Sequence, residues 1–202
     1  QNKHNKTLKR VKIVKVNYLE KFKEEGVSIL DTMTKEELID VIKTLNQSYY
    51  IGDDKIKNSL LSDNQYDIIM LWHVLEHILD IETGIATLRK KLRKNGAIVV
   101  AVPNRDCFDS KVYKKYWAAW DVPRHLYHFN HNSLIDFMKN NGFSLISRHP
   151  LLLDAYYISY LSSKYKKSFF PWINSFLLGT ISNILGAITS KYSSSFYVFK
   201  RD

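Results

Sequence analysis

Cysteine, glycine and proline are all scarce in this 202-residue chain, which has one cysteine, seven glycines and four prolines. The single Cys107 excludes an internal disulfide and a zinc site built from several cysteines, and it suits a reducing compartment. The sequence starts at Gln1 without a basic, apolar leader, so we expect no secretory signal and a cytoplasmic location. Because 45% of the residues are hydrophobic and 13% aromatic, the composition excludes a disordered chain. We expect a single domain over residues 1–202 with a sizeable core.

Acidic residues become rare along the chain, and no glutamate follows Glu82. Residues 1–82 carry 12 Lys and Arg against 14 Asp and Glu, whereas residues 83–202 carry 18 against 6. This asymmetry favours an anionic partner for the second half, such as a phosphorylated or carboxylated substrate, an acidic membrane surface or nucleic acid. The alternative is a compositional bias, because lysine, asparagine and isoleucine are abundant throughout the chain.

Two hydrophobic runs separated by a helix predict a parallel strand–helix–strand unit. Asp67–Leu71 is the first strand, Thr87–Lys94 a basic helix, and Ala97–Val102 the second strand after Gly96. In parallel sheets, ligands bind beyond the carboxyl ends of the strands. The polar clusters that follow both strands are therefore the first place to look for function.

The remaining elements predict an α/β fold, a Rossmann-like, doubly wound and mostly parallel sheet with a late antiparallel strand and a C-terminal helical insert. Residues 1–26 have the spacing of a basic amphipathic helix. Capping signals favour helices at 35–45 and Leu134–Asn140. The further strands are expected at Val27–Asp31, Ser48–Ile51, Phe143–Ser147 and Ser193–Lys200.

Two segments stand outside this alternation. Residues 104–130 form a long, aromatic-rich stretch without periodicity, and loops of that length are usually functional. Residues 168–190 carry no charge, within an apolar helical insert at 166–192. One proline, two asparagines, two glycines and several hydroxyl residues dilute that segment, so we expect a buried or membrane-surface helical pair in preference to a membrane-spanning helix.

Three motifs carry a family resemblance: DIIMLWHVLEH at Asp67–His77, VPN at Val102–Asn104, and WAAWDVPRHLYHF at Trp117–Phe129. Together with the segment that begins at Leu153, they cover about half of the chain. They resemble a bacterial branch of the class I S-adenosylmethionine-dependent methyltransferases. The resemblance implies a methyltransferase fold, S-adenosylmethionine as cofactor, and an acceptor lid at 104–130.

The chain departs from this family at its cofactor loop. Family members have a glycine-rich G-x-G-x-G loop after the first strand, where the backbone approaches the cofactor. Here Asp31 is followed by Thr32–Glu37, which contains no glycine. The segment between Asp53 and Asp67 is also too short for the usual helix and third strand. Either the first half has diverged or residues are missing from it.

The resemblance assigns cofactor contacts to strand ends. Asp53 lies 22 residues after Asp31, where an acidic residue holds the ribose hydroxyls. Asp31 would contact the cofactor from the first strand end, and Leu71 and Trp72 would flank the adenosine. Asp53 is alternatively part of an ordinary Gly-Asp-Asp turn, and Asp31 a capping carboxylate.

Histidines and the lid provide the other candidates. Methyl transfer needs alignment in a dry pocket, and a base where the acceptor atom carries a proton. The candidate bases are His73, His125 and His128, because imidazole titrates near neutrality. On the lid, Arg124 would grip an anionic group and aromatic residues would exclude water. The expected acceptor-binding residues are Asn104, Trp117, Arg124 and Tyr127.

The spacing His73-x-x-Glu76-His77 also resembles metal motifs. A zinc protease with H-x-x-E-H needs a downstream carboxylate ligand, which is normally a glutamate, and no glutamate follows Glu82. The matching E-x-x-E-H turn of ubiquinone-pathway O-methyltransferases is associated with a divalent metal, but His73 replaces its first glutamate. We therefore expect no metal and interpret Glu76 and His77 as polar groups that hold the loops.

These observations lead to two functional hypotheses. The first is a methyltransferase that transfers a methyl group from S-adenosylmethionine to a small, anionic or lipid-linked acceptor. The second is an inactive descendant that binds or scaffolds, having lost the cofactor loop. Contact with a membrane surface through residues 168–190 is compatible with either. Nucleic acid is not an expected partner, because no aromatics interleave the basic run at 90–94.

Overall fold

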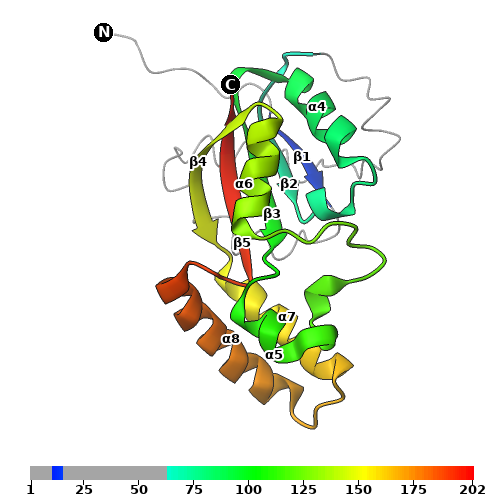
Figure 1. Ribbon diagram of the computed structural model, residues 1–202, viewed down its shortest axis with the longest axis vertical. Coiled ribbons are helices and arrows are strands. Elements are labelled where there is room, and N and C mark those ends of the chain that lie inside the picture. The colour runs from blue at the N-terminus through cyan, green and yellow to red at the C-terminus, as the bar shows by residue number, and fades with distance from the viewer. Residues whose placement is uncertain (1–10, 16–62) are drawn as a thin grey trace.

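The computed structural model describes residues 11–15 and 63–202, and within them five strands form one sheet in the order β1-β2-β3-β5-β4 (Figure 1). β1 (Val11–Lys15), β2 (Tyr66–Trp72) and β3 (Leu92–Pro103) pair in parallel. β5 (Ser194–Arg201) runs antiparallel to both of its neighbours, β3 and β4 (Phe143–Pro150). The predicted mostly parallel sheet with a late antiparallel strand is confirmed.

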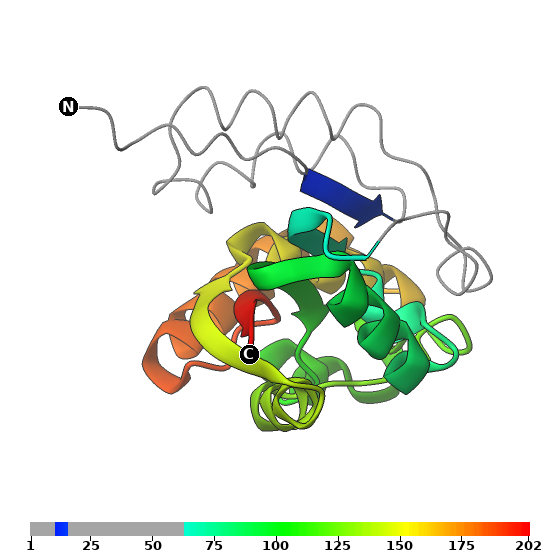
Figure 2. The same cartoon turned by 90° about the horizontal axis from the view of Figure 1, so that it is seen from above.

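Alternating side chains of the central strands build two cores. Ile69 and Leu71 of β2 and Val100 of β3 face one core, whereas Met70 and Val99 face the other. This period of two is the pattern of a sheet that is covered on both faces. α4 (Ile81–Lys91) and α6 (His131–Asn140) cover the first core from the same side (Figure 2).

Several predicted boundaries move because of local contacts. Asp80 caps α4 by accepting a hydrogen bond from the Thr83 amide at 3.1 Å, so the helix starts earlier than expected. β3 starts at Leu92, before Gly96, because Leu92 already pairs with Tyr66. α6 also starts early, since Asn130 forms a capping box with Ser133.

The first described strand corrects the expectation of a helix over residues 1–26. Val11–Lys15 is a strand that pairs in parallel with Ile68–Trp72. The segment VKIVK is rich in β-branched residues, which fit a strand beside a central partner better than a helix. The predicted elements at 27–31, 35–45 and 48–51 lie outside the described residues.

A group of helices lies beyond the carboxyl ends of β2 and β3 (Figure 1). The stretch 104–130, predicted as a loop, contains α5 (Phe108–Tyr113) and the short 3-10 helices η3 (Lys114–Tyr116) and η4 (Ala118–Trp120). We retain the name lid for residues 104–130. The insert predicted at 166–192 contains one helix, α8 (Pro171–Thr189), and not the expected helical pair. α8 packs against α7 (Leu152–Tyr165), which lies before the insert.

Asp109 joins the elements of this helical group. Its side chain is fully buried and accepts hydrogen bonds from Trp117 Nε1 (2.8 Å), Ser182 Oγ (2.7 Å) and Ser193 Oγ (2.6 Å). These donors come from the lid, from α8 and from the residue before β5. One carboxylate thus fixes the lid and the insert to the sheet.

The thiol of Cys107 lies near this carboxylate. Burial is the larger cause that raises the pKa of the Cys107 thiol, and the charge of Asp109 is the second, so the thiol stays neutral.

Replacing Asp109 with alanine should lower the free energy of unfolding by about 3 kcal/mol, because three buried donors lose their acceptor. Urea unfolding of the purified protein measures this. Asp106→Ala removes a half-exposed carboxylate three residues away and is the matched control. Equal stability of the two variants would contradict the joining role of Asp109.

Candidate functional site

A cavity of about 370 Å³ lies between the carboxyl ends of β2 and β3, the lid and α7. Trp72 and His73 line it from the end of β2, and Pro103 from the end of β3. The opposite wall is formed by α7. Its position is the one at which open parallel sheets bind ligands, and its volume suits a small molecule.

His73 is the charged centre of this cavity. Its Nδ1 lies 3.3 Å from Glu76 Oε1, and its Nε2 lies 3.1 Å from Asp154 Oδ2. Burial by itself would lower the pKa of His73, but the Asp154 carboxylate, followed by Glu76, outweighs it and raises the pKa to about 10. Both ring nitrogens therefore donate at neutral pH. This corrects the expectation that His73 is a base, since both nitrogens of an imidazolium already carry a proton and neither can accept another.

The backbone at His73 has an uncommon conformation. Its φ of 50° places a non-glycine residue in the left-handed region. Such residues are held by their surroundings and are common at functional sites. The two carboxylates hold the ring in place, so the turn after β2 is tied to α7.

Glu76 lies under the lid, with only 1% of its side chain exposed. Its carbonyl accepts hydrogen bonds from the amides of Leu126 (2.8 Å) and Tyr127 (3.3 Å), which fastens the lid to η2 (Leu75–His77). Its Oε2 has no hydrogen-bond partner among the described residues. A buried carboxylate oxygen therefore remains available to a ligand beside the cavity.

The rings of His77 and His125 both lie close to Glu76, and each is held by a hydrogen bond to a backbone carbonyl. His77 Nδ1–H donates to the Arg124 carbonyl at 2.9 Å, and His125 Nδ1–H donates to the Ala119 carbonyl at 2.8 Å. A carbonyl only accepts, so in the neutral form each ring carries its lone pair on Nε2. Burial lowers the pKa of His125, although the Glu76 carboxylate partly opposes the shift. His125 is therefore neutral at pH 7 and able to accept a proton.

Three side chains have the arrangement of a metal-ligand set. One ligand atom each from Glu76, His77 and His125 lies within 4.8 Å of the others. Backbone carbonyls orient both imidazoles, as second-sphere partners do in metal sites. The sequence motif His73-x-x-Glu76-His77 did not identify this set, because the ring nitrogens of His73 contact carboxylates and the third ligand comes from the lid.

The predicted acceptor-binding residues separate into two groups. Arg124 lines the cavity and forms an ion pair with Asp121 at 2.6 Å. The indole of Trp117 is buried and bonded to Asp109, and Asn104 Nδ2 donates to the Tyr192 carbonyl at 3.1 Å. Tyr127 Oη donates to the Leu79 carbonyl at 3.1 Å. These last three stabilise the lid, and none of them lines the 370 Å³ cavity.

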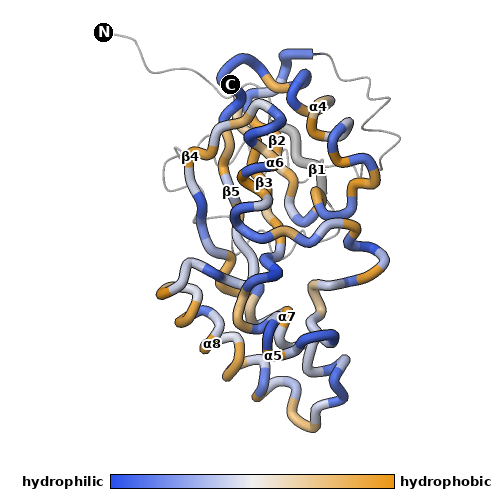
Figure 3. Tube along the Cα trace, viewed as in Figure 1, coloured by the Kyte–Doolittle hydropathy of each residue, from blue (hydrophilic) through white to orange (hydrophobic). Residues whose placement is uncertain are grey.

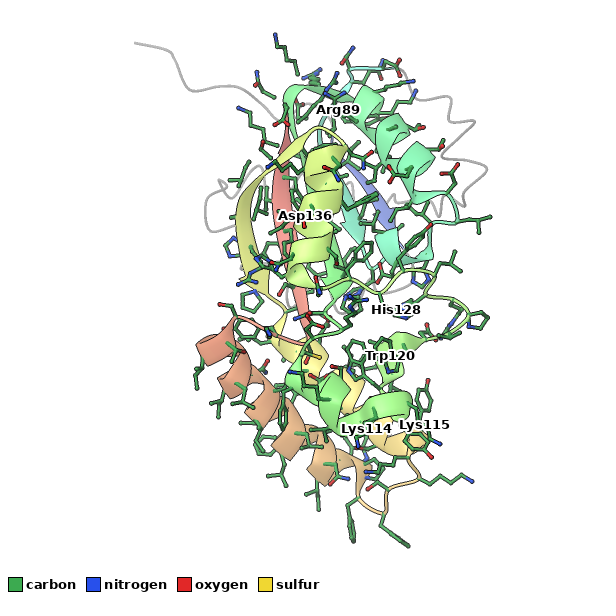
Figure 4. The ribbon with its side chains drawn as sticks, in the orientation of Figure 1. Arg89, Lys114, Lys115, Trp120, His128 and Asp136 are labelled. Carbon is green, nitrogen blue, oxygen red and sulfur yellow. The ribbon has the colours of Figure 1, made fainter. Side chains whose placement is uncertain are left out.

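His128 also belongs to the framework of the lid. Its Nε2 lies 2.8 Å from the Trp120 carbonyl, and its ring packs edge-on against the Trp120 ring at 5.0 Å (Figure 4). It borders a small hollow beside the main cavity and is not among the residues that line the cavity itself. Of the three candidate bases, His125 combines a neutral ring with a place in the cavity.

The predicted cofactor residues lie in different places. Trp72 lines the cavity and stacks on Phe196 with ring centroids 6.0 Å apart. Leu71 is fully buried in the core on the other face of the sheet. Asp31 and Asp53 lie outside the described residues.

Sequence reasoning missed the contribution of α7. Asp154, Tyr157, Leu161 and Tyr165 line the cavity from this helix. Their spacing of three and four residues puts them on one helical face, and this spacing was the available signal. The segment that begins at Leu153 contributed to the family resemblance, but no helix was predicted there.

His73→Gln should destabilise the protein by about 3 kcal/mol near pH 6, because two buried carboxylates lose their cation. The folded-state pKa of about 10 lies above the unfolded value of about 6.5. The contribution is therefore complete below pH 6.5 and is lost as the pH rises towards 10. Urea unfolding across this range measures the difference in the free energy of unfolding between wild type and variant. His149→Gln, outside the cavity, is the control. A difference for His73→Gln that does not change with pH would refute the ion pair.

Comparisons with known proteins agree with this fold. A family model described as a methyltransferase domain matches residues 10–148. A solved S-adenosylmethionine-dependent methyltransferase from Thermotoga maritima is 13% identical, with 79% of this chain and 68% of that chain covered and a TM-score of 0.51. A complex of a methyltransferase activator and a methyltransferase from Haloferax volcanii matches at 10% identity, over 95% and 81% of the chains, with a TM-score of 0.50. A comparison with curated proteins finds no match.

At these identities the solved structures show the fold alone. The family model covers more than half of the chain and includes β2, α4, β3, the lid and α6. It therefore spans the residues that form the sheet side of the cavity. By this match, the chain belongs to the methyltransferase domain family.

Proposed function

We propose that the chain transfers a methyl group from S-adenosylmethionine to a small acceptor that is lipid-linked or anionic. The observation that carries this proposal is the cavity at the ends of β2 and β3, which the neutral ring of His125 lines. The family supports the cofactor, and the apolar wall of α7 supports an acceptor with an apolar part.

The charges around the cavity fit a positively charged sulfonium. Asp121 and Asp154 line it, Glu76 is buried beside it, and His73 and Arg124 supply the cations on the described side. Trp72 would hold the cofactor at the end of β2, with Asp31 and Asp53 as the further contacts that the family resemblance implies. When bound, the cofactor supplies an electrophilic methyl group.

The other residues position the acceptor and move its proton. His125 Nε2 accepts the proton of an acceptor hydroxyl or amine, while Nδ1–H remains on the Ala119 carbonyl. His73 stays protonated and fixes the two carboxylates that face it. The lid excludes water, and Arg124 at the mouth is placed to contact an anionic group. Ile158 and Leu161 of α7 offer the apolar surface for a lipid-like part.

Calorimetric titration with S-adenosylmethionine and S-adenosylhomocysteine tests the cofactor. We expect micromolar dissociation constants, weakened about tenfold or more by Asp53→Ala, because an alanine cannot accept hydrogen bonds from the ribose. Asp63→Ala removes an exposed carboxylate that contacts Lys91 and should bind as the wild type does. No heat of binding from a folded chain would contradict the proposal and favour the inactive scaffold.

Transfer of tritium from S-[methyl-³H]adenosylmethionine into an extract of the cells that naturally make this chain tests the chemistry. The label should enter a small molecule, and His125→Gln should reduce the rate by about 10²-fold while leaving S-adenosylhomocysteine binding unchanged. His149→Gln is the control. Partition into butanol or water distinguishes lipid-linked from free acceptors, and label in protein or nucleic acid would contradict the proposal.

A further inference from the structure

α8 has an inverted arrangement of residues, with small polar residues inside and large apolar residues outside. Among the helices of the described residues, it alone is long and apolar enough to cross a membrane. Yet only 22% of its most apolar stretch is buried. Apolar residues recur along the tube of α8 in Figure 3. The exposed side chains include Trp172, Ile173, Phe176, Leu177, Ile184 and Ile188.

The buried stripe of α8 explains this orientation. Ser175 Oγ donates to the Tyr156 carbonyl at 2.6 Å, and Ser182 Oγ donates to Asp109. A side chain at Gly179 would come within 2.6 Å of the Tyr156 ring, so only glycine allows this approach. The helix is therefore fixed with its apolar face away from the protein. A helix of a globular protein normally buries that face, and contiguous exposed apolar surface marks an interaction site.

Charges around this face select the partner. Lys164, Lys166 and Lys167 are exposed just before α8, and Lys191 is exposed just after it. No aspartate or glutamate occurs from residue 155 to residue 201. Lysines beside an apolar face attract anionic lipid headgroups. A second copy of the chain is a poorer partner, because two-fold pairing of this face would bring lysines against lysines.

Aromatic residues at the start of α8 also fit a membrane interface. Phe169 is 96% exposed and Phe170 66% exposed, in the turn between the lysines and Trp172. Aromatic side chains concentrate at the level of lipid headgroups. Both ends of α8 remain attached to the folded domain, through α7 before it and Ser193 after it. The helix is thus positioned to lie in a surface and not to cross the bilayer.

We propose that the outer face of α8, together with Phe169 and Phe170, binds the surface of an anionic lipid membrane with the helix parallel to it. α7 packs on α8 and also lines the cavity, through Tyr157 and Leu161. Where the proposed methyl transfer holds, this docking brings the cavity close to lipid-linked acceptors. The docking itself depends only on α8 and its flanking lysines.

Sedimentation of the full chain with vesicles tests the docking. Vesicles of phosphatidylcholine with phosphatidylglycerol should bind the protein about tenfold more tightly than vesicles of phosphatidylcholine alone, and salt should weaken this preference. The double variant W172S/F176S should lower binding about tenfold or more through lost apolar contact. The variant K166Q/K167Q should remove much of the preference for anionic lipid.

Controls separate the alternatives. Ile146→Ser replaces an exposed apolar residue on β4 and should bind vesicles as the wild type does. All variants should retain calorimetric binding of S-adenosylhomocysteine, so a failure of docking and a failure of the methyltransferase proposal are distinguishable. Equal binding by every variant, or no binding to either vesicle, would overturn the proposal. A dimer that sediments in ultracentrifugation and becomes monomeric in W172S/F176S, without vesicle binding, would assign the face to self-association.

Discussion

The site depends on one buried ion cluster, in which the imidazolium of His73 lies between the carboxylates of Glu76 and Asp154. Removal of His73 would leave two buried carboxylates without their cation in a low-dielectric place, which is strongly unfavourable. The cluster fixes the left-handed turn after β2, holds Glu76 under the lid, and joins the sheet to α7. The cavity exists where these three elements meet.

The lid is shaped by backbone carbonyls as much as by side chains. The carbonyls of Ala119, Trp120 and Arg124 accept from His125, His128 and His77 respectively. These contacts determine which ring nitrogen of each histidine carries the proton. The three rings thus differ in place: one lines the cavity with a lowered pKa, one belongs to the framework of the lid, and one lies beside Glu76. Two of these carbonyl contacts orient His77 and His125, each of which has a ligand atom within 4.8 Å of one on Glu76.

Much of the sheet could be predicted from the sequence because its strands are continuous apolar runs. The central parts of β2, β3 and β5 are such runs. The bounds of β2 and β5 were expected to within one residue, as was the end of β3, whereas β3 starts five residues before its expected first residue. β1 was not predicted, because five residues with two lysines three positions apart fit either a short strand or an amphipathic helix, and only pairing with β2 decides. α7 was missed because its apolar and polar residues lie on several faces, against the cavity, α5 and α8.

The candidate site was predictable in position but not in the roles of its residues. Strand ends located Trp72 and His73, since the carboxyl edge of a parallel sheet collects such groups. The charge of His73 depends on Asp154, which lies 81 residues later in the sequence and was not paired with it. The direction of Trp117 depends on Asp109 in the same way. In a segment without periodicity, tertiary partners decide which side chains point to a ligand.

A crystal structure of the full chain grown with S-adenosylhomocysteine tests the central claim most directly. The account predicts ligand density beyond the carboxyl end of β2, in contact with Trp72 and with its sulfur facing the cavity that His73 and His125 line. Ligand density elsewhere on the molecule, or none at saturating ligand, would contradict a methyl-transfer site at this edge of the sheet.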